Sequence, residues 1–502
     1  MLVAGVDSST QSTKVLLCQA EDGTVVGHAT SPHPDGTECD PELWWRALRL
    51  AGDGLLDRAD AVGVAAQQHG MVVLDEAGQV IRPALLWNDM RSAPQAAELI
   101  AEMGGPAEWA RRTGSVPTAS FTVTKLRWMA ENEPENAART DRVLLPHDWL
   151  TWRLASDSGS AAAGSGPGSG SGSGPGSGSR SGPGSGSGSG PGSGSAAEPS
   201  TDRGDASGTG YFSPATGHWL PDLAEAALRR PVRLPRVAGP AEIVARTPGG
   251  AALSAGTGDN MGAALGLGLG LGEVVVSIGT SGTAYAVAAT PAADESGLVA
   301  GFADATGRFL PLVATVNAAR VLTVTARMLG TDADGLSRLA LAAPAGAQGL
   351  TLLPYLDGER SPNRPDAHGV LRGLTSSNTT PENLARAAVE AVLCSLADAI
   401  DNLADCGITA QRVILIGGAA RSRAVRAVAP AIFGVPVTVP EAGEYVALGA
   451  ARQAAWAVSG AAEAPAWRAA GSAAEYTAEP TPQVRHRYGA LRDDTAGWGA
   501  AM

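Results

Sequence analysis

Two segments, one in each half of the chain, repeat the same order of an apolar run, a small polar turn and a second apolar run. They span residues 2–18 and 273–287. Short apolar runs bounded by turn residues are typical of buried strands, so each segment predicts a β-hairpin. One hairpin in each half predicts a duplicated domain, with the two copies facing a shared cleft.

Further strands are expected where apolar residues run without interruption. Residues 61–65 and 412–416 show this pattern, which predicts buried strands. Residues 71–74, followed by the polar turn at 75–78, predict another hairpin.

Helices are predicted at 41–50 and 381–403, where apolar residues recur at helical spacing. Asp40 and Thr380 are favourable N-cap residues, and a proline follows each of them at the first helical position. The last forty or so residues are rich in alanine and predict helix. Strands and helices that alternate along the chain indicate an α/β architecture.

One internal segment has a different composition. Residues 164–195 are glycine, serine and proline with the single exception of Arg180. Such a segment cannot bury apolar surface and predicts a flexible coil. A turn-rich pattern resumes at 201–212 and completes what precedes the insertion. We therefore expect an enlarged surface loop inside the first domain, which costs little because loop entropy grows slowly with length.

Length and charge narrow the class of protein. The chain has 502 residues, 44% of them hydrophobic, which makes two domains the default expectation. A formal net charge of -13 argues against binding to nucleic acid or to anionic membranes. The chain starts directly with a strand pattern and lacks an apolar run long enough for a membrane span. Four cysteines without a C-x-x-C pair fit buried thiols in a reducing compartment. We therefore expect a soluble cytoplasmic protein.

Several common nucleotide-binding motifs are absent. Neither lysine, Lys14 or Lys125, follows a glycine, so the chain has no Walker A loop. It also lacks a G-x-G-x-x-G after the first strand and the lysine–glutamate scheme of protein kinases. What remains are small-residue turns at 7–13, 279–282 and 417–422, each at the end of an apolar strand. Such turns expose backbone N–H and hydroxyl groups that suit phosphate.

Two aspartates in or near these turns each fit two roles. Asp7 ends the first strand and fits either a turn-capping residue or a ligand for Mg²⁺ beside a transferring phosphate. Asp259 begins a helix in a flexible, glycine-containing turn. It fits either a helix N-cap or a base that accepts a hydroxyl proton.

A second group of polar residues follows strands in the first half. His69 comes directly after a buried strand and is flanked by Gln68 and Gly70. Residues 87–91 combine an indole with amide, carboxylate and guanidinium groups, which suits a polyhydroxylated ligand. The alternative for these residues is an ordinary surface loop with one buried tryptophan.

Seven motifs, in order, resemble those of the FGGY carbohydrate kinases. They lie at 5–14, 68–70, 86–91, 258–260, 277–282, 353–360 and 416–422. The resemblance extends from about residue 2 to about residue 457, interrupted by the glycine/serine/proline insertion. Within the family, the motifs around His69 and Trp87 are most similar to those of members that act on D-xylulose.

The resemblance implies two domains of the actin/hexokinase/Hsp70-like ATPase fold, an α/β (ribonuclease H-like) architecture, with a cleft between the domains. We expect an N-terminal, sugar-binding domain at 1–248 with a disordered insertion at about 158–198. A C-terminal, nucleotide-binding domain is expected at 249–460, and a tail at 461–502. The expected ligands are ATP, Mg²⁺ and the sugar, without nucleic acid or membrane, and a homodimer is the assembly to test.

The resemblance also implies residue roles. Asp259 would be the catalytic base and Asp7 would serve the metal. By the same resemblance Gln68, His69, Asp259 and Asn260 would contact the sugar, and the composition of the 87–91 group adds Trp87, Asn88 and Asp89 as expected sugar contacts. Residues expected to face the nucleotide are Thr10, Gln11, Ser12, Lys14, Gly279, Thr280, Ser281, Gly417, Gly418 and Ala419. Two positions depart from the family pattern: Ala419 replaces a common third glycine, and Gln68 stands where many D-xylulose-specific members have methionine.

The activity implied is phosphorylation of D-xylulose by ATP to D-xylulose 5-phosphate. One alternative is another kinase of this family that acts on ribulose, gluconate, glycerol or a deoxysugar. A second is an ATP-driven switch of the same fold, chaperone-like or filament-forming, although no peptide-binding domain follows the core. A third is a sugar-responsive DNA regulator, against which the acidic charge argues.

Overall fold

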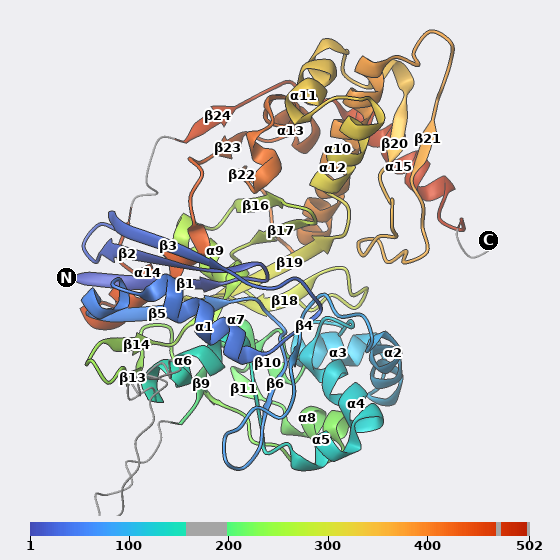
Figure 1. The fold of residues 1–502 in the computed structure, drawn as a ribbon. Coiled ribbons are helices and arrows are strands. Elements are labelled where there is room, and N and C mark those ends of the chain that lie inside the picture. The colour runs from blue at the N-terminus through green and yellow to red at the C-terminus, as the bar shows by residue number, and fades with distance from the viewer. Residues whose placement is uncertain (157–197, 468–472, 499–502) are drawn as a thin grey trace, which may run out of the picture.

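The computed structural model describes residues 1–156, 198–467 and 473–498. Two seven-stranded sheets form its centre, and each draws its main hairpin from a different half of the chain (Figure 1). The coil predicted at 164–195 lies outside the described residues.

The first sheet has the strand order β13-β14-β5-β1-β2-β3, and β15 also pairs with β5. β1 runs antiparallel to β2 and parallel to β5, which confirms the hairpin predicted at 2–18 and the strand predicted at 61–65. The strands are β1 (Leu2–Ser8), β2 (Ser12–Gln19), β3 (Val25–Pro32), β5 (Ala61–Ala66), β13 (Ile243–Arg246), β14 (Ala252–Ser254) and β15 (Thr257–Gly258).

The second sheet has the order β18-β19-β17-β16-β22-β23-β24. β16 runs antiparallel to β17 and parallel to β22, so its central strands repeat the arrangement of β1, β2 and β5. The predicted duplication of the hairpin is thereby confirmed. The strands are β16 (Glu273–Ile278), β17 (Gly282–Ala286), β18 (Ala300–Ala303), β19 (Phe309–Thr315), β22 (Arg412–Ile416), β23 (Val437–Val439) and β24 (Ala474–Tyr476).

Helices cover both sheets, and the longest of them, α12, packs against β17 and β19. The predicted N-caps are confirmed, because Asp40 accepts a hydrogen bond from Glu42 N and Thr380 accepts one from Asn383 N. The helices are α1 (Pro41–Gly52), α2 (Ala93–Glu102), α3 (Pro106–Thr113), α4 (Thr122–Asn132), α5 (Pro134–Arg139), α6 (Pro146–Ser156), α7 (Arg203–Ala206), α8 (Pro221–Leu228), α9 (Asp259–Leu267), α10 (Ala319–Met328), α11 (Ala333–Ala342), α12 (Pro381–Asp405), α13 (Arg423–Phe433), α14 (Tyr445–Ser459) and α15 (Pro482–Asp494). The described residues also form the short 3₁₀ helices η1 (Leu56–Arg58), η2 (Ala347–Gly349) and η3 (Gly418–Arg421).

The remaining strands form small two-stranded pairs outside the main sheets. They are β4 (Glu38–Cys39) with β7 (Ala84–Leu85), β6 (Val72–Leu74) with β8 (Arg142–Leu144), β9 (Ser200–Thr201) with β12 (Arg236–Val237), β10 (Phe212–Ser213) with β11 (His218–Trp219), and β20 (Thr351–Leu353) with β21 (Val370–Arg372). Among the helices of the described ranges, none combines the length and hydropathy that a membrane span requires.

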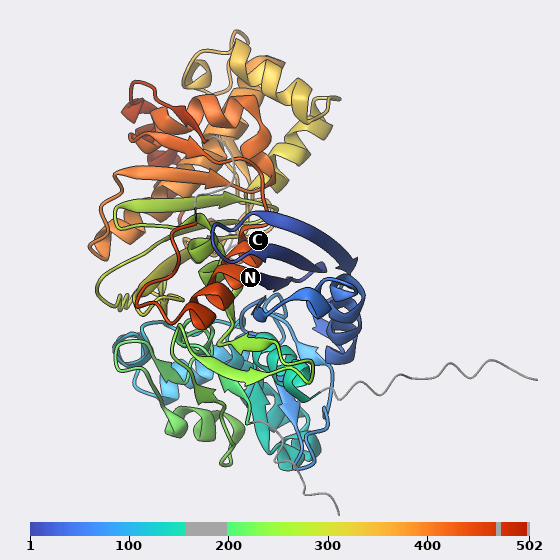
Figure 2. The same ribbon diagram turned by 90° about the vertical axis from the view of Figure 1, so that its left-hand side faces the viewer.

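Helix α14 comes late in the chain but packs against the first sheet, on β1 and β5, and against α9. Figure 2 shows this red helix beside the blue N-terminal strands. Glycines allow the close approach: a Cβ atom on Gly5 would lie 1.9 Å from the carbonyl oxygen of Ala447, and one on Gly449 would lie 1.8 Å from that of Gly262. The helix therefore touches the backbones of both β1 and α9.

In two regions the structure adds strand pairing beyond the predictions. The hairpin predicted at 71–78 is present but short: after the turn, Val80 makes an antiparallel bridge to Leu74 and Ile81 N donates to the carbonyl oxygen of Val73, while β6 also pairs with β8. Pro83 follows closely, and proline cannot donate to a strand ladder. In the C-terminal region, α15 is the predicted helix, but β24 pairs with β23 and extends the second sheet.

The domain limits 1–248, 249–460 and 461–502 stay predictions. Strands as late as β15 belong to the first sheet, and α14 returns to it. The chain thus passes between the two sheets more than once.

Candidate functional site

A cleft of about 400 Å³ collects residues from both halves of the chain. This volume lies within the range of small-molecule sites. Six of the residues predicted from the sequence line it: Asp7, Lys14, Asp259, Asn260, Gly417 and Gly418. The turns that end β1 and β22 therefore open onto the same space as the start of α9.

Asp7 is buried at the end of β1, directly opposite Lys14 on β2. The two residues are held by an ion pair of 3.6 Å between Lys14 Nζ and Asp7 Oδ2, and Ser9 Oγ donates a hydrogen bond to the same carboxylate. Burial raises the pKa of Asp7 to about 6, although Ser9 and Lys14 act in the opposite direction. Lys14 also donates to Glu444 Oε2 over 2.7 Å, so one cation lies between two carboxylates.

Asp259 is the first residue of α9 and not its N-cap, which is Gly258. Its Oδ1 accepts hydrogen bonds from Asn260 N (2.8 Å) and from Asn260 Nδ2 (2.9 Å). Asn260 Nδ2 also donates to Gln68 Oε1 over 3.0 Å, which ties the first half of the chain to this carboxylate. Burial raises the pKa of Asp259 to about 7, and the negative charges of Asp7 and Asp205 add to this. A carboxylate with a pKa near neutrality is suited to accept a proton.

This pKa sets an expected pH dependence. If Asp259 accepts the proton of the reacting hydroxyl, it must be ionised in the free enzyme, so kcat/KM for the phosphoryl acceptor should fall as pH drops through about 7. Initial rates measured from acid to alkaline pH, at saturating nucleotide, test this. A profile that stays flat well below pH 7 would contradict the assignment.

His69, three residues after the end of β5, has a left-handed backbone conformation with φ of 67°. Its Nδ1 lies 2.6 Å from the carbonyl oxygen of Gly208, which can only accept, so Nδ1 carries the proton and Nε2 remains an acceptor. Burial and the nearby charge of Lys125 lower the pKa of His69 to about 3. The ring is therefore neutral and offers a hydrogen-bond acceptor.

Lys125 holds His69 in this conformation. Its ammonium group is fully buried and donates to the carbonyl oxygens of His69 (2.7 Å) and Ser120 (2.6 Å). Burial lowers the pKa of Lys125 to about 7. Thr122 Oγ1 donates to the same His69 carbonyl over 3.2 Å. Positive φ is rare for residues other than glycine, and such strain persists where surrounding bonds enforce it.

The three residues of the predicted Trp87–Asp89 group point to different partners. Trp87 Nε1 donates to Thr10 Oγ1 over 2.8 Å and so joins the turn between β1 and β2. Asn88 Nδ2 donates to the carbonyl oxygen of Gly36. Asp89 Oδ1 accepts from the backbone N (3.0 Å) and Nε (2.9 Å) of Arg91. Although burial alone would raise the pKa of Asp89, the bonds from Arg91 lower it. None of the three lines the cleft of the described residues, and sugar contact by them stays a prediction.

Only some residues of the small-residue turns predicted to face the nucleotide line the cleft. Gly417 has φ of 90°, and a Cβ there would lie 2.7 Å from the backbone of Ile278, so the turn after β22 touches the end of β16 and requires glycine. Gly418 begins η3 and is exposed. The other predicted nucleotide residues lie in the same turns without lining the cleft: Thr10, Gln11, Ser12, Gly279, Thr280, Ser281 and Ala419.

Two further residues of the site escaped the sequence analysis. Glu444 lines the cleft and binds Lys14, but it precedes α14 in a segment without any motif. Lys125 supports His69 without lining the cleft, and its signal was composition: only two of the 37 lysine and arginine residues are lysines.

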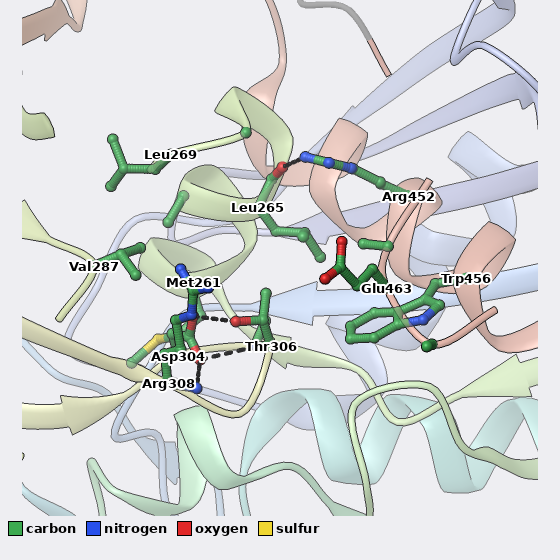
Figure 3. Close-up of a pocket in the computed structure, with 15 residues that line it drawn as sticks. Met261, Leu265, Leu269, Val287, Asp304, Thr306, Arg308, Arg452, Trp456 and Glu463 are labelled. Atoms are coloured by element: carbon green, nitrogen blue, oxygen red, sulfur yellow. Dashed lines mark hydrogen bonds between the residues drawn. The ribbon is translucent and has the colours of Figure 1, made fainter. Parts of the chain in front are cut away.

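A second cavity, of about 340 Å³, is lined by other residues of α9, among them Met261 and Leu265 (Figure 3). Arg452 and Trp456 of α14 line one of its walls, and Arg452 Nη1 donates to the carbonyl oxygen of Leu265 over 2.6 Å. The Asp304 carboxylate accepts hydrogen bonds from Thr306 Oγ1 and from the backbone N of Arg308. None of the predicted site residues lines this cavity. Within residues 1–156, 198–467 and 473–498, no group of three or more His, Cys, Asp or Glu residues could hold a metal ion.

Comparison with known families matches both parts of the chain. The description "FGGY family of carbohydrate kinases, N-terminal domain" covers residues 2–164, and "FGGY family of carbohydrate kinases, C-terminal domain" covers residues 274–458.

Individual proteins match over nearly the whole chain. The xylulose kinase of Streptomyces coelicolor is 43% identical over 471 residues, which cover 90% of this chain and 87% of that protein. The xylulose kinase of Streptomyces rubiginosus is 41% identical with the same coverage. The crystal structure of xylulose kinase from Bifidobacterium adolescentis superposes with a TM-score of 0.85 at 42% identity, covering 98% of this chain and 99% of that one.

Proposed function

Because the chain belongs to the FGGY family of carbohydrate kinases, we propose that it transfers the γ-phosphoryl group of ATP to the C5 hydroxyl of D-xylulose. One observation carries this proposal. Asp259, a carboxylate with a pKa of about 7, opens onto the same cleft as Asp7, Lys14 and the Gly417 turn. A base, a cation and a backbone turn that suits phosphate are the parts that phosphoryl transfer requires.

Asp259 acts as the base in this proposal. Its ionised form accepts a hydrogen bond from the attacking hydroxyl and takes its proton as the bond to phosphorus forms. Asn260 fixes the carboxylate through two hydrogen bonds, and Gln68 fixes Asn260 in turn. The neutral His69 offers Nε2 as an acceptor for a second sugar hydroxyl.

The nucleotide is proposed to lie with its phosphates beside Lys14 and its adenosine beside the Gly417–Gly418 turn. Lys14 then neutralises phosphate charge, and the turn allows close backbone approach. Asp7 and Asp259 both line the cleft beside Lys14, and their carboxylates supply the oxygen donors that Mg²⁺ takes from proteins, which supports a site for the ion here. Mg²⁺ binds proteins through one or two carboxylates together with substrate phosphates. Asp7 would hold the ion, which when bound neutralises charge on the transferring group.

The choice of D-xylulose rests on the relatives, which are named xylulose kinases and align over 90% of the chain. The test is ADP release from ATP and Mg²⁺ with D-xylulose, D-ribulose, L-ribulose, glycerol and gluconate in parallel, against a blank without sugar. We expect strong turnover with D-xylulose and little with the others. Preference for another sugar would replace the substrate but keep the reaction. Turnover independent of every sugar would favour an ATP-driven switch.

A further inference from the structure

A cluster of four ionisable side chains is buried without lining the cleft, and none of the four has a direct role in the proposed reaction. His147 of α6 and Asp205 of α7 are both fully buried, and His147 Nδ1 lies 2.6 Å from Asp205 Oδ2. On its other side, His147 Nε2 lies 3.2 Å from Asp148 Oδ1 and 4.0 Å from Asp202 Oδ1. One imidazole therefore lies beside three carboxylates. These carboxylates come from both sides of segment 157–197 in the sequence.

The charge of this imidazole is set by its neighbours. Burial alone would lower the pKa of His147, but Asp148, Asp205 and Asp202 raise it to about 9. His147 is therefore a cation at neutral pH and compensates buried negative charge. Removing one partner of a buried ion pair leaves an uncompensated charge, which is costly.

The cluster is connected to the segment that holds His69. Asp202 caps α7 by accepting hydrogen bonds from the backbone N of Gly204 (2.9 Å) and of Asp205 (2.8 Å). The carbonyl oxygen of Asp205 then accepts a hydrogen bond from Gly208 N, and the carbonyl oxygen of Gly208 accepts one from His69 Nδ1–H. A Cβ on Gly208 would lie 2.9 Å from the His69 ring, so the two are in contact. The cluster is thus connected by hydrogen bonds to the Gly208 carbonyl, which fixes the tautomer of His69.

The buried cluster around His147 is also connected to the segment that holds Asp259. Thr257 Oγ1 donates to Asp202 Oδ2 over 2.8 Å, two residues before Asp259. Gly256, with φ of 76°, packs against the imidazole, since a Cβ there would lie 2.5 Å from His147 Cδ2. The backbone leading into α9 therefore rests directly on the ring of His147 and on one of its carboxylate partners.

We propose that His147 is a positioning residue that, through Asp205 and Asp202, holds the two segments presenting His69 and Asp259 to the sugar. It touches neither the sugar nor the nucleotide, and it acts through the Gly208 carbonyl and through Thr257. Loss of its cation lets both segments relax, which misplaces the acceptor hydroxyl relative to the phosphoryl group. This inference rests on the proposed sugar kinase activity.

The experiment compares H147N, H147K and T257V with the unchanged protein, using H28N at an exposed histidine of β3 as the matched control. H147N should lower kcat/KM for D-xylulose by roughly 10²-fold, the cost of a small misplacement of reacting groups, while KM for ATP stays unchanged. H147K should recover most of the activity, because its ammonium group restores the cation. T257V keeps the His147 cation but removes the hydrogen bond to Asp202. It should therefore lower kcat/KM for D-xylulose less than H147N does, and it should likewise leave KM for ATP unchanged.

A second readout needs no turnover. Spectra of protein with isotope-labelled histidine, assigned with H69N, should show His69 with a fixed Nδ1–H tautomer in the unchanged protein and in H28N, and a mixture in H147N. Melting temperatures establish which variants are folded. If H147N does not fold, the kinetic comparison is made with H147K and T257V. Unchanged kcat/KM for the sugar in folded H147N or T257V, or equal losses for sugar and ATP, would overturn the proposal.

Failure of the proposed function gives a different result. If the unchanged protein prefers another sugar, or turns over none, the proposed substrate or activity is wrong. The kinetic comparison then uses the preferred sugar, and the tautomer of His69 still tests the positioning role without any substrate. Unchanged activity in H147N beside normal D-xylulose turnover in the unchanged protein contradicts the positioning role alone.

Discussion

Replacing Asp259 with asparagine is expected to lower kcat by roughly 10²- to 10⁴-fold, the usual contribution of a general base. Asparagine keeps the shape and the hydrogen bonds to Asn260 but cannot take the hydroxyl proton. KM for ATP should change little, since the nucleotide is proposed to bind beside Lys14 and Gly417. Steady-state rates with saturating ATP and varied D-xylulose provide the measurement.

The stability of the same variant is the control. The pKa of Asp259 is raised from its ordinary value to about 7 in the folded protein, so between these values the folded state binds more protons than the unfolded state. Its contribution to stability is therefore lost as pH rises through about 7. D259N lacks this buried charge, and its melting temperature at pH 8 should equal or exceed that of the unchanged protein. Near-normal turnover in a folded D259N would show that another group is the base.

Replacing Gly449 with alanine is expected to destabilise the protein by about 1–3 kcal/mol or more, the cost of overpacking a close contact. The added Cβ would lie 1.8 Å from the carbonyl oxygen of Gly262 and 2.9 Å from the backbone N of Gly266. Both belong to α9, so the helices must separate before the methyl group fits. Separation would shift Asp259 at the start of α9 and should also lower kcat.

Gly489 in α15 is the matched control for that substitution. A Cβ there meets its nearest atom, Nη2 of Arg492, only at 4.0 Å. Because alanine has the higher helix propensity, G489A should be neutral or stabilising by up to about 1 kcal/mol. Thermal and urea unfolding of both variants measure the difference. A G449A protein as stable as G489A would mean that α9 and α14 are not held in backbone contact.

Much of this architecture could be predicted because its signals are local. The hairpins at β1–β2 and β16–β17 are short apolar runs around small-residue turns, and the helix starts at Asp40 and Thr380 carry their own caps. Each depends on neighbours within a few residues, so spacing and residue type are sufficient. Sequence motifs likewise placed Asp7 at the end of the first strand and Gly417 after the strand at 412–416 before any contact was known.

Contacts between residues far apart in the chain could not be predicted this way. Strand β6 also pairs with β8, about seventy residues later, and no local signal predicts this pairing. The ion pair of Lys14 with Glu444 exists because α14 returns to β1 through glycine contacts. The bond of His147 to Asp205 spans 58 residues.

The physical reason is the range of the interactions. Turn geometry, capping and the alternation of apolar residues act over a few residues and leave a pattern in the sequence. Burial and Coulomb interactions act through space: Asp7, Asp205 and the walls of the cleft together raise the pKa of Asp259 to about 7. The sequence shows which acids, amides and turns are present, and the packing of α9 between the two sheets decides which of them meet and how strongly each holds its proton.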